Sequence, residues 1–338
     1  MGDALLDIRG LTVSFDSRNG SPPARALRGV DLRIAGSEVH GLVGESGSGK
    51  TVTSTCVMGL LPTPPAQVDA GSIIFGGRDL LTLGPEERRK VRGRQIAMVF
   101  QEPARYLNPA FRVGEQIGEM LRLHEGMDRS QASTRAAELA DLVGLGGARR
   151  VLGAYPHELS GGMKQRAMIA MAISCKPALL IADEPTTALD VTLQAQILKL
   201  LLRLRSALRM GILFISHDLR LVRAIADRVS VMYAGRVVES GPREELYDSP
   251  RHPYTRLLLQ SIPSAQRRGT RLRVITGRVP DARAVPEGCA FHPRCPLAAE
   301  RCRQEDPVLA GSGAGSGTGG PRFDHTAACH FAGTTWQD

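Results

Sequence analysis

The residues best suited to chemistry lie in one stretch, Gly44-Glu45-Ser46-Gly47-Ser48-Gly49-Lys50-Thr51, which follows the apolar run Val39–Val43. Its spacing, G-x-x-x-x-G-K-T, is that of a phosphate-binding loop between a strand and a helix. Glycines let successive backbone N–H groups converge on an anion, and the helix that begins near Lys50 adds the positive end of its dipole. We expect Lys50 to reach the β- and γ-phosphates of a nucleotide and the Thr51 hydroxyl to bind Mg²⁺.

Two later apolar runs end in polar residues. Ala178–Ala182 leads into Asp183-Glu184-Pro185, and Gly211–Ser216 leads into His217. Ligands bind at the carboxyl ends of parallel strands in open α/β sheets, so these positions are candidates for phosphate chemistry. Asp183 is expected to hold Mg²⁺ and Glu184 to polarise the attacking water. The other interpretation of the adjacent carboxylates is a solvated strand end.

A further anion-binding candidate is Leu159-Ser160-Gly161-Gly162-Met163 at the start of a predicted helix. Ser160 is a natural N-cap, and the glycines leave backbone N–H groups open to an incoming anion. The methionines beside this stretch are expected to serve in packing.

The remaining pattern predicts an α/β fold. Short strands at Leu5–Ile8, Leu11–Phe15, Leu27–Val30 and Leu32–Ile34, without intervening helices, indicate a small antiparallel sheet beside the main one. A helix is predicted over Thr51–Leu61, and strands over Ser72–Phe75, Gln95–Phe100, Val229–Tyr233 and Arg236–Glu239. Residues 113–174 are predicted to form a helical insertion, with Ala132, Ala136, Leu139, Ala140 and Val143 on one face. Phe15 is placed to stack on a base, with a core role as the other interpretation.

Composition narrows the class of protein. The chain has 338 residues and a formal net charge of +9, with no block of like charges, which favours a solvated Arg-rich surface over a nucleic-acid patch. Charged residues near the N-terminus argue against a signal peptide, and no apolar run approaches the roughly twenty residues of a membrane span. We therefore expect a cytosolic protein, or one bound to a membrane through partners.

Four of the six cysteines, Cys289, Cys295, Cys302 and Cys329, follow in the spacing C-x5-C-x6-C-x26-C. Four thiolates suit Zn²⁺ or an iron–sulfur cluster, although the absence of C-x-x-C pairs argues against zinc. His292, His325 and His330 lie nearby as possible substitute ligands. The Gly/Ser run Gly311–Gly320 is predicted to be a flexible linker, while Cys56 and Cys175 are expected to be buried thiols.

Taken in order, the phosphate loop, Gln101, Leu159–Met163, the Asp183-Glu184-Pro185 strand end and His217 resemble the nucleotide-binding subunits of ABC transporters over residues 5–260. The resemblance implies that Phe15 stacks on adenine, where the family more often has Tyr, and that Gln101 contacts the Mg²⁺ site. It also implies that Ser160, Gly161 and Gly162 bind the γ-phosphate of ATP held by a facing subunit, and that Asp190 links the two sites. Glu184 would be the catalytic base, and His217 would grip the γ-phosphate. Met163 replaces the commoner Gln, as in peptide-importer subunits.

Residues after 250, which we call the tail, indicate a smaller group within this family. His252-Pro253-Tyr254-Thr255 and Ser261-Ile262-Pro263 resemble the C-terminal extension of bacterial oligopeptide and dipeptide importer ATPases, a group that includes nickel importers. In that family the four cysteines are implied to bind a [4Fe–4S] cluster, and the alternatives here are zinc or free thiols. The implied partners are a second ATP-binding subunit, two membrane permeases and an extracytoplasmic solute-binding protein, with the chain at the cytoplasmic face of the inner membrane.

The resulting prediction is an ABC-type P-loop NTPase core with an antiparallel β subdomain and a helical subdomain, plus a small Cys-rich extension. Residues 1–260 would form the nucleotide-binding domain, with the helical subdomain at about 104–176, and residues 261–338 the extension. The predicted function is ATP hydrolysis coupled to peptide import. The alternative is an ABC-type ATPase acting on nucleic acid with a zinc-binding tail, which the lack of a dense basic stripe disfavours.

Overall fold

The computed structural model describes residues 4–17, 20–187, 189–262, 275–311 and 325–334. The chain divides into two compact units. We call the first the helical unit (Met1–Leu5, Ile34–Glu38 and Asp79–Ile215) and the second the phosphate-loop unit (Leu6–Arg33, Val39–Arg78 and Ser216–Asp338). No helix in the described part of the chain is both long and apolar enough to cross a bilayer.

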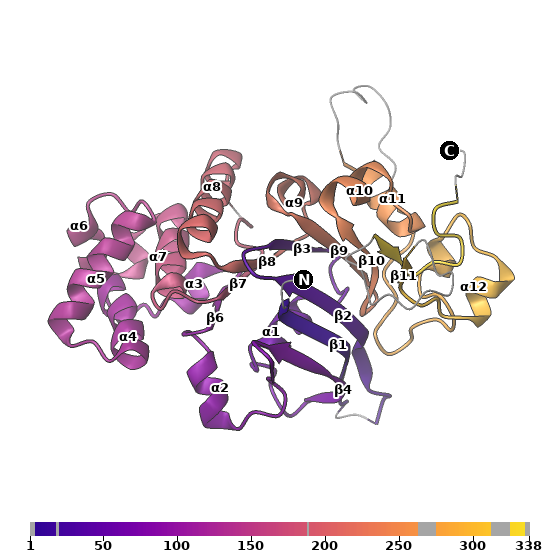
Figure 1. Ribbon diagram of the computed structural model, residues 1–338, viewed down its shortest axis with the longest axis horizontal. Helices are drawn as coiled ribbons and strands as arrows, with labels where there is room; N and C mark the ends of the chain where they lie inside the picture. Colours follow the sequence, from indigo (N-terminus) through magenta and orange to yellow (C-terminus); the bar gives the residue numbers. More distant parts are fainter. Residues whose placement is uncertain (1–3, 18–19, 188, 263–274, 312–324, 335–338) are drawn as a thin grey trace. The chain divides into compact units, whose positions relative to one another are not determined.

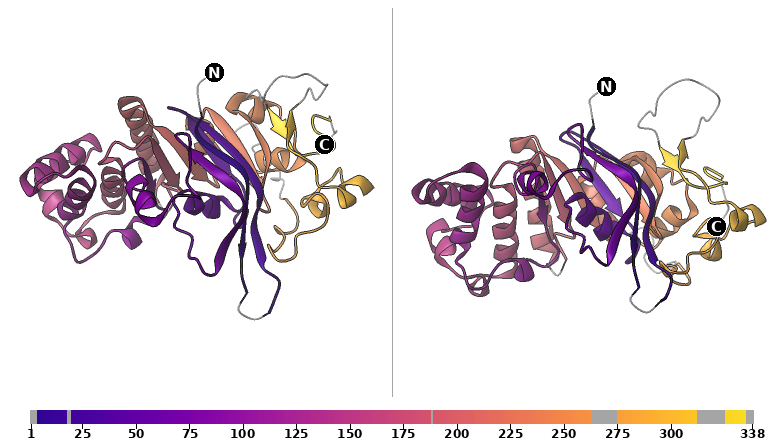
Figure 2. Two further views of the ribbon diagram at one scale, coloured as in Figure 1. Left: turned by 60° about the horizontal axis from the view of Figure 1, so that its bottom comes forward. Right: turned by 90° about the horizontal axis from the view of Figure 1, so that it is seen from below.

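A four-stranded sheet with the order β2-β1-β4-β5 contains most of the N-terminal residues. Its strands are β1 (Ala4–Phe15), β2 (Ala24–Ala35), β4 (Ala66–Phe75) and β5 (Arg78–Asp79), and Figure 2 shows the first three as long ribbons side by side. Because β1 and β4 run antiparallel, the predicted antiparallel sheet is confirmed. The strands are longer than predicted, since β1 passes through Gly10 with a shift of register between Arg9 and Thr12 and does not break there. Glycine inside a strand often marks such a bulge.

The other strands of the phosphate-loop unit follow the order β11-β12-β10-β9-β3. They are β3 (Val39–Val43), β9 (Arg228–Tyr233), β10 (Arg236–Pro242), β11 (Ala310–Gly311) and β12 (Thr326–Ala327). Every residue of β3 is buried, and β3 pairs with β9 in parallel. The predicted hairpin of β9 and β10 is confirmed, and Ala234 and Gly235 at its turn both have positive φ, which matches the twist of the two strands.

The helices of this unit are α1 (Lys50–Val57), α9 (Leu219–Ile225), α10 (Arg243–Asp248), α11 (Pro253–Gln260) and α12 (Glu300–Gln304). Helix α1 is shorter than the predicted span Thr51–Leu61. Gly59 adopts a left-handed φ of 61° just after its end, and Leu60 N–H donates to Thr55 O at 2.8 Å. A left-handed glycine closes the last turn of the helix, so α1 ends before the predicted end at Leu61.

In the described part of the chain, the helical unit contains seven α-helices and three strands. Its elements are α2 (Pro85–Val91), β6 (Ile96–Val99), α3 (Pro103–Tyr106), α4 (Val113–Glu125), α5 (Arg129–Leu142), α6 (Ala148–Gly153), α7 (Gly161–Ile173), β7 (Leu179–Asp183), α8 (Val191–Leu208) and β8 (Gly211–Ser216), of which the last residue already belongs to the other unit. Helices α4 to α7 pack together as the predicted helical insertion (Figure 1). The predicted apolar face of α5 is buried at Ala132, Ala136, Leu139 and Ala140.

Strands β6, β7 and β8 pair in parallel, with β7 in the middle. All residues of β7 are buried, from Leu179 to Asp183. A strand covered on both faces needs a continuous apolar run rather than an alternating one. The apolar run therefore fills β7 up to Ala182. The polar residues Asp183 and Glu184 follow at the carboxyl edge of the three strands.

Candidate nucleotide-binding site

The turn from β3 into α1 forms a loop whose backbone requires glycine. Gly47 and Gly49 have φ values of 80° and 107°, a region that residues with a side chain rarely adopt. A Cβ atom at Gly49 would lie 2.8 Å from Leu27 Cδ2 and 3.1 Å from the carbonyl oxygen of Ala26. The loop can therefore adopt this backbone, and pack against Ala26 and Leu27, because these positions carry no side chain.

Two polar side chains of this loop are buried. Lys50 Nζ donates to the carbonyl oxygens of Gly44 at 2.8 Å and Glu45 at 3.0 Å, which holds the ammonium group across the loop. Ser48 is fully buried, and within the described part of the chain its hydroxyl has no hydrogen-bond partner. A buried polar group without a partner is costly, so Ser48 Oγ marks a place for a polar ligand.

The predicted carboxylate pair lies at the end of β7 in the helical unit. Asp183 is buried, and Glu184 has a positive φ of 46°, which is uncommon for a residue with a long side chain. Glu184 Oε2 accepts from Gln101 Nε2 at 2.9 Å and from Thr187 Oγ1 at 3.0 Å. The structure thus brings together two of the predicted residues, Gln101 and Glu184, and holds the carboxylate in one orientation. Strained backbone of this kind is concentrated at functional sites.

The predicted N-cap of α7 is confirmed: Ser160 Oγ accepts from the backbone N–H of Met163 at 3.3 Å. Ser160 and Gly161 are exposed, so this helix start is open to solvent. Gly162 has a second role that the sequence did not reveal. It is buried, and a Cβ there would lie 3.1 Å from Leu193 Cδ2 of α8, so glycine lets the two helices approach.

Three further predicted residues lie at or next to the ends of elements. Asp190 is the N-cap of α8, and its Oδ1 accepts from Leu193 N–H at 2.9 Å. His217 is exposed and directly follows β8. Phe15 is half-buried at the end of β1, where it pairs with Ala66 of β4. None of these positions contradicts the roles expected of them.

The four tail cysteines are free thiols, of which Cys302 is buried and the others half-buried. Cys289 N–H donates to Cys302 O at 2.9 Å, so these two segments are adjacent. Burial raises the pKa of Cys295 to about 12 and that of Cys329 to about 11, which makes both neutral thiols at physiological pH. Among the described residues, however, no three Cys, His, Asp or Glu side chains are arranged to hold a metal ion. The predicted [4Fe–4S] site is not supported by this arrangement.

The tail histidines that the sequence suggested as substitute ligands are engaged elsewhere. His292 Nδ1 is 3.0 Å from Cys289 O, and His330 Nε2 is 3.0 Å from Glu305 O. His325 Nε2 lies 2.6 Å from Glu239 Oε1, and both side chains are buried. Most of the predicted Gly/Ser linker, residues 312–320, falls outside the described residues.

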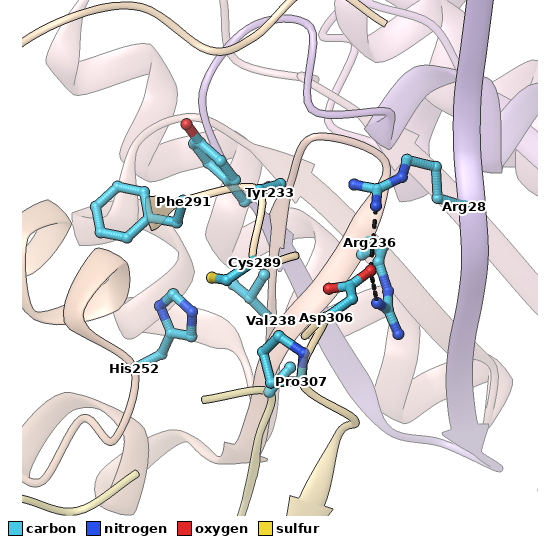
Figure 3. Close-up of a pocket in the computed structure, with 11 residues that line it drawn as sticks. Arg28, Tyr233, Arg236, Val238, His252, Cys289, Phe291, Asp306 and Pro307 are labelled. Atoms are coloured by element: carbon cyan, nitrogen blue, oxygen red, sulfur yellow. Dashed lines mark hydrogen bonds and ion pairs between the residues drawn. The ribbon is translucent and has the colours of Figure 1, made fainter. Parts of the chain in front are cut away.

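A small pocket lies beside Cys289 in the phosphate-loop unit (Figure 3). Asp306 there forms ion pairs with Arg28, at 3.1 Å, and with Arg236. Burial lowers the pKa of His252, which also lines the pocket, to about 4, and its Nδ1 accepts from Tyr254 N–H. The charged groups drawn in Figure 3 are therefore paired with one another, and they join the tail to β2 and β10.

Comparison with known proteins decides the family. Residues 27–187 match the ABC transporter family, and residues 238–302 match the family described as oligopeptide/dipeptide transporter, C-terminal region. A peptide import ATP-binding protein of Brucella melitensis biotype 1 is 52% identical over 317 residues, covering 90% of this chain and 93% of that protein. The chain belongs to the ABC transporter ATP-binding proteins of the peptide-import group. The predicted family is therefore confirmed.

Other relatives of this ABC group agree with that assignment. The dipeptide transport ATP-binding protein DppD of Escherichia coli (strain K12) is 47% identical, covering 90% of this chain and 93% of the relative. The ABC fold is shown by the solved dimeric ATP-binding cassette MJ0796 in a post-hydrolysis state bound to ADP and Pi, with a TM-score of 0.63 and 26% identity. That match covers 70% of this chain and 98% of the solved chain. Nothing in these comparisons supports the nucleic-acid alternative.

Two residues near the phosphate loop of this ABC protein were missed as site residues. Tyr254 of α11 and Arg294 of the turn η3 (His292–Arg294) both bond to Glu45. Tyr254 lies in the tail motif His252–Thr255 and Arg294 lies between Cys289 and Cys295, but their contacts with Glu45 span more than two hundred residues of chain. A contact of that separation leaves no local pattern, so the sequence alone offered no signal for it.

Proposed function

We propose that this protein is the ATP-hydrolysing subunit of an importer that carries peptides across the cytoplasmic membrane. The observation that carries the nucleotide part is the loop at the start of α1, whose backbone depends on glycine and which holds the buried hydroxyl of Ser48, a group without a hydrogen-bond partner among the described residues. The peptide part is supported by the names of the relatives, which are peptide import and dipeptide transport ATP-binding proteins.

In this proposal the loop Gly44–Thr51 surrounds the phosphates of ATP through backbone N–H groups, while Lys50 neutralises part of their charge. The oxygen donors Thr51, Gln101 and Asp183 are of the kind that Mg²⁺ prefers, and we assign them as its ligands. When bound, Mg²⁺ supplies positive charge to the phosphate oxygens. Phe15 is assigned to the adenine.

Glu184 is the proposed general base. Its Oε2 is already oriented by Gln101 and Thr187, which leaves the carboxylate fixed while it accepts a proton from the attacking water. His217 is the proposed contact to the γ-phosphate. Gln101 donates a hydrogen bond to the same carboxylate, so a movement of Gln101 changes the position of the base. We therefore also assign Gln101 the role of sensing the membrane subunit, which the resemblance to ABC subunits implies.

The exposed start of α7 is assigned to a second subunit's ATP. Ser160, Gly161 and Gly162 would close over that γ-phosphate, and Asp190 would link the two sites. ATP then joins two subunits, and loss of the γ-phosphate after hydrolysis releases them. The further partners in this proposal are a second, different ATP-binding subunit, two permeases contacted through Gln101 and the helical insertion, and an extracytoplasmic solute-binding protein, with the chain peripheral at the cytoplasmic face of the inner membrane.

The test is Glu184→Gln, which keeps the shape of the side chain but removes the base. We expect nucleotide binding to persist while turnover falls by about 10³-fold, and the ATP-bound dimer to accumulate. Glu138→Gln serves as the matched control, because Glu138 lies on the exposed surface of α5 in an ion pair with Arg135. Normal hydrolysis by Glu184→Gln would remove Glu184 from the proposed role.

The nucleic-acid alternative predicts DNA binding that weakens steeply with salt, because phosphate contacts release counterions. The transport proposal predicts co-purification with permease subunits and ATP turnover that responds to them. Titration of the purified chain with duplex DNA at two salt concentrations therefore separates the two functions.

We also propose that residues 261–338 form the extension of a nucleotide-binding domain at 1–260, and that Cys289, Cys295, Cys302 and Cys329 hold a [4Fe–4S] cluster. The donor chemistry supports this proposal, because the tail carries four free thiols, and a hydrogen bond from the Cys289 backbone N–H to the carbonyl oxygen of Cys302 makes two of their segments adjacent. Thiols must lose protons to bind metal, so uptake should be accompanied by proton release. Iron and acid-labile sulfide measured on anaerobically purified protein distinguish this cluster from zinc.

A further inference from the structure

The cysteine-containing tail contacts the phosphate loop through an ion pair with two hydrogen bonds. Arg294 Nη1 lies 2.9 Å from Glu45 Oε2, and Arg294 Nη2 lies 3.1 Å from Glu45 Oε1. The Arg294 side chain is only 6% exposed and that of Glu45 is 27% exposed, so the pair is largely shielded from solvent. Paired, two-pronged contacts of this kind fix orientation as well as distance, because the planar guanidinium matches the carboxylate.

Arg294 is held in place by contacts that do not involve Glu45. Its Nε donates to Thr276 O at 2.9 Å, and its Nη1 donates to Tyr233 Oη at 3.3 Å. The guanidinium carbon also lies 5.7 Å from the centre of the Tyr233 ring and 6.0 Å from that of Phe291. The arginine is therefore a rigid group presented to the loop, and Glu45 is the partner that it orients.

The backbone of Glu45 is held from the same region. Glu45 N–H donates to Tyr254 Oη at 3.0 Å. The Tyr254 ring is buried against Tyr233 and Phe291, with ring centres 4.7 and 5.3 Å apart. Both the main chain and the side chain of Glu45 are thus fixed by residues that belong to α11 and to the tail.

Glu45 in turn supports the polar groups of the loop. Its carbonyl oxygen accepts from Lys50 Nζ at 3.0 Å and from the Ser48 backbone N–H at 3.2 Å. Glu45 also brings a negative charge close to a loop suited to anions, and Arg294 neutralises that charge. If the Arg294 contact is lost, the loop loses an anchor and the carboxylate repels phosphate.

We propose that Arg294 is a positioning residue of the ATP site, through which the fold of the cysteine-containing tail sets the affinity of the phosphate loop for ATP. This inference rests on the proposed function, because it requires the loop to bind ATP phosphates. Arg294 lies between Cys289 and Cys295 in the sequence, so the segment that carries these thiols also carries the guanidinium. It acts through Glu45 and does not itself contact the reacting atoms.

The first experiment compares the full-length chain with Arg294→Gln by titration with ATP·Mg²⁺ and by steady-state hydrolysis. We expect the Kd and the KM for ATP to rise by about tenfold, the scale of one lost charge-assisted hydrogen bond, while kcat at saturating ATP changes less than about twofold. Arg294→Lys should recover part of the affinity, since it keeps the charge but not the two-pronged geometry.

The matched control is Arg301→Gln. Arg301 is also in the tail and also forms an ion pair, with Glu305 at 2.7 Å, but both side chains are exposed. Its KM should equal that of the unmodified chain. Equal KM values for Arg294→Gln and Arg301→Gln would overturn the inference, as would an equal loss of kcat and affinity.

A second variant keeps the inference testable if Arg294→Gln does not fold. Tyr254→Phe preserves the ring in its aromatic cluster and removes only the acceptor of Glu45 N–H, so we expect the KM for ATP to rise about threefold. Tyr247→Phe is its control, because the Tyr247 hydroxyl bonds to Leu219 O and does not contact the loop. An unchanged KM in Tyr254→Phe counts against the inference.

The two levels of the proposal fail in different ways. If the unmodified chain neither binds nor hydrolyses ATP, the proposed function fails. If the unmodified chain and Arg301→Gln bind ATP equally and Arg294→Gln binds it just as well, the proposed function stands and only the role of Arg294 is lost. Combining Glu45→Gln with Arg294→Gln adds a third measurement, in which the two effects should be far from additive because the residues act as a pair.

Discussion

Two helix starts in this molecule are suited to phosphate, and they are built differently. At the start of α1 the backbone is forced into shape by glycines with positive φ, and the polar side chains of Ser48 and Lys50 are buried. At the start of α7 the Ser160 hydroxyl caps its own helix, and Ser160 and Gly161 are exposed. The loop before α1 is therefore shaped without any ligand, whereas the start of α7 is an exposed surface that a ligand on another subunit could approach.

The same contrast appears in the space around the glycines. A Cβ at Gly49 would meet Leu27 and the Ala26 carbonyl at 2.8 and 3.1 Å, while a Cβ at Gly161 would meet its nearest atom, Leu189 Cδ2, at 3.9 Å. Glycine is a steric necessity at the first helix start. At the exposed start of α7 there is room for a side chain at Gly161 within the described chain. A glycine there can therefore matter only for a ligand or subunit that approaches from outside. Equivalent alanine substitutions should therefore separate the two.

The largest effect is expected for Gly49→Ala. The new methyl group would put a side chain on a residue with φ of 107° and would clash with Leu27, so the loop would be displaced. Backbone strain of this kind costs roughly 1–3 kcal/mol, and with the clash we expect ATP affinity to fall by about 100-fold. Titration with a fluorescent ATP analogue measures this change. Gly36→Ala is the control, since among the described residues a Cβ there meets no heavy atom within 4 Å. Unaltered binding by Gly49→Ala would refute the idea of a sterically defined pocket.

A smaller, selective effect is expected for Gly161→Ala. Because the methyl group fits within this chain, ATP binding by the single subunit should stay within about twofold, while ATP-dependent association should weaken by about tenfold if a facing nucleotide must approach the helix start. Sedimentation of the Glu184→Gln background with and without ATP measures the association. Gly146→Ala, at an exposed glycine with open surroundings among the described residues, is the control. Association equal to that control would show that the α7 start takes no part in joining subunits.

The smallest effect is expected for Ser48→Ala, and its two parts have opposite signs. Removing a buried hydroxyl that has no partner in the described structure should raise the stability of the nucleotide-free protein by about 1 kcal/mol, while ATP affinity should fall several-fold. Thermal unfolding with and without ATP records both changes. Ser206→Ala on the exposed side of α8 should change neither. A loss of stability without nucleotide would indicate that Ser48 serves the fold and not the ligand.

Local chemistry is what the sequence predicted well. The phosphate loop, the N-cap at Ser160 and the buried strand before Asp183 each depend on residues a few positions apart, and all three are present. The sequence was less successful where glycine can either end a strand or bend it, as at Gly10, which lies inside a continuous β1. It could not predict the Arg294–Glu45 pair, because only tertiary folding brings residues of that separation together. The ABC-type core follows from the sequence and the roles of the candidate residues stay predictions, whereas the connection between tail and loop could not be predicted.

The short strand β12 covers one edge of the sheet. It pairs with β10 at Glu239–Ala327 and Ser240–Thr326, and thereby covers hydrogen-bonding groups that would otherwise form an open sheet border. Unpaired strand borders recruit strands from other molecules and promote aggregation. A truncated protein that lacks β11 and β12 would expose the unpaired border of β10. It would also leave the buried Glu239 carboxylate without its partner His325. Poor solubility of such a fragment would then reflect a lost cover and not a misfolded core.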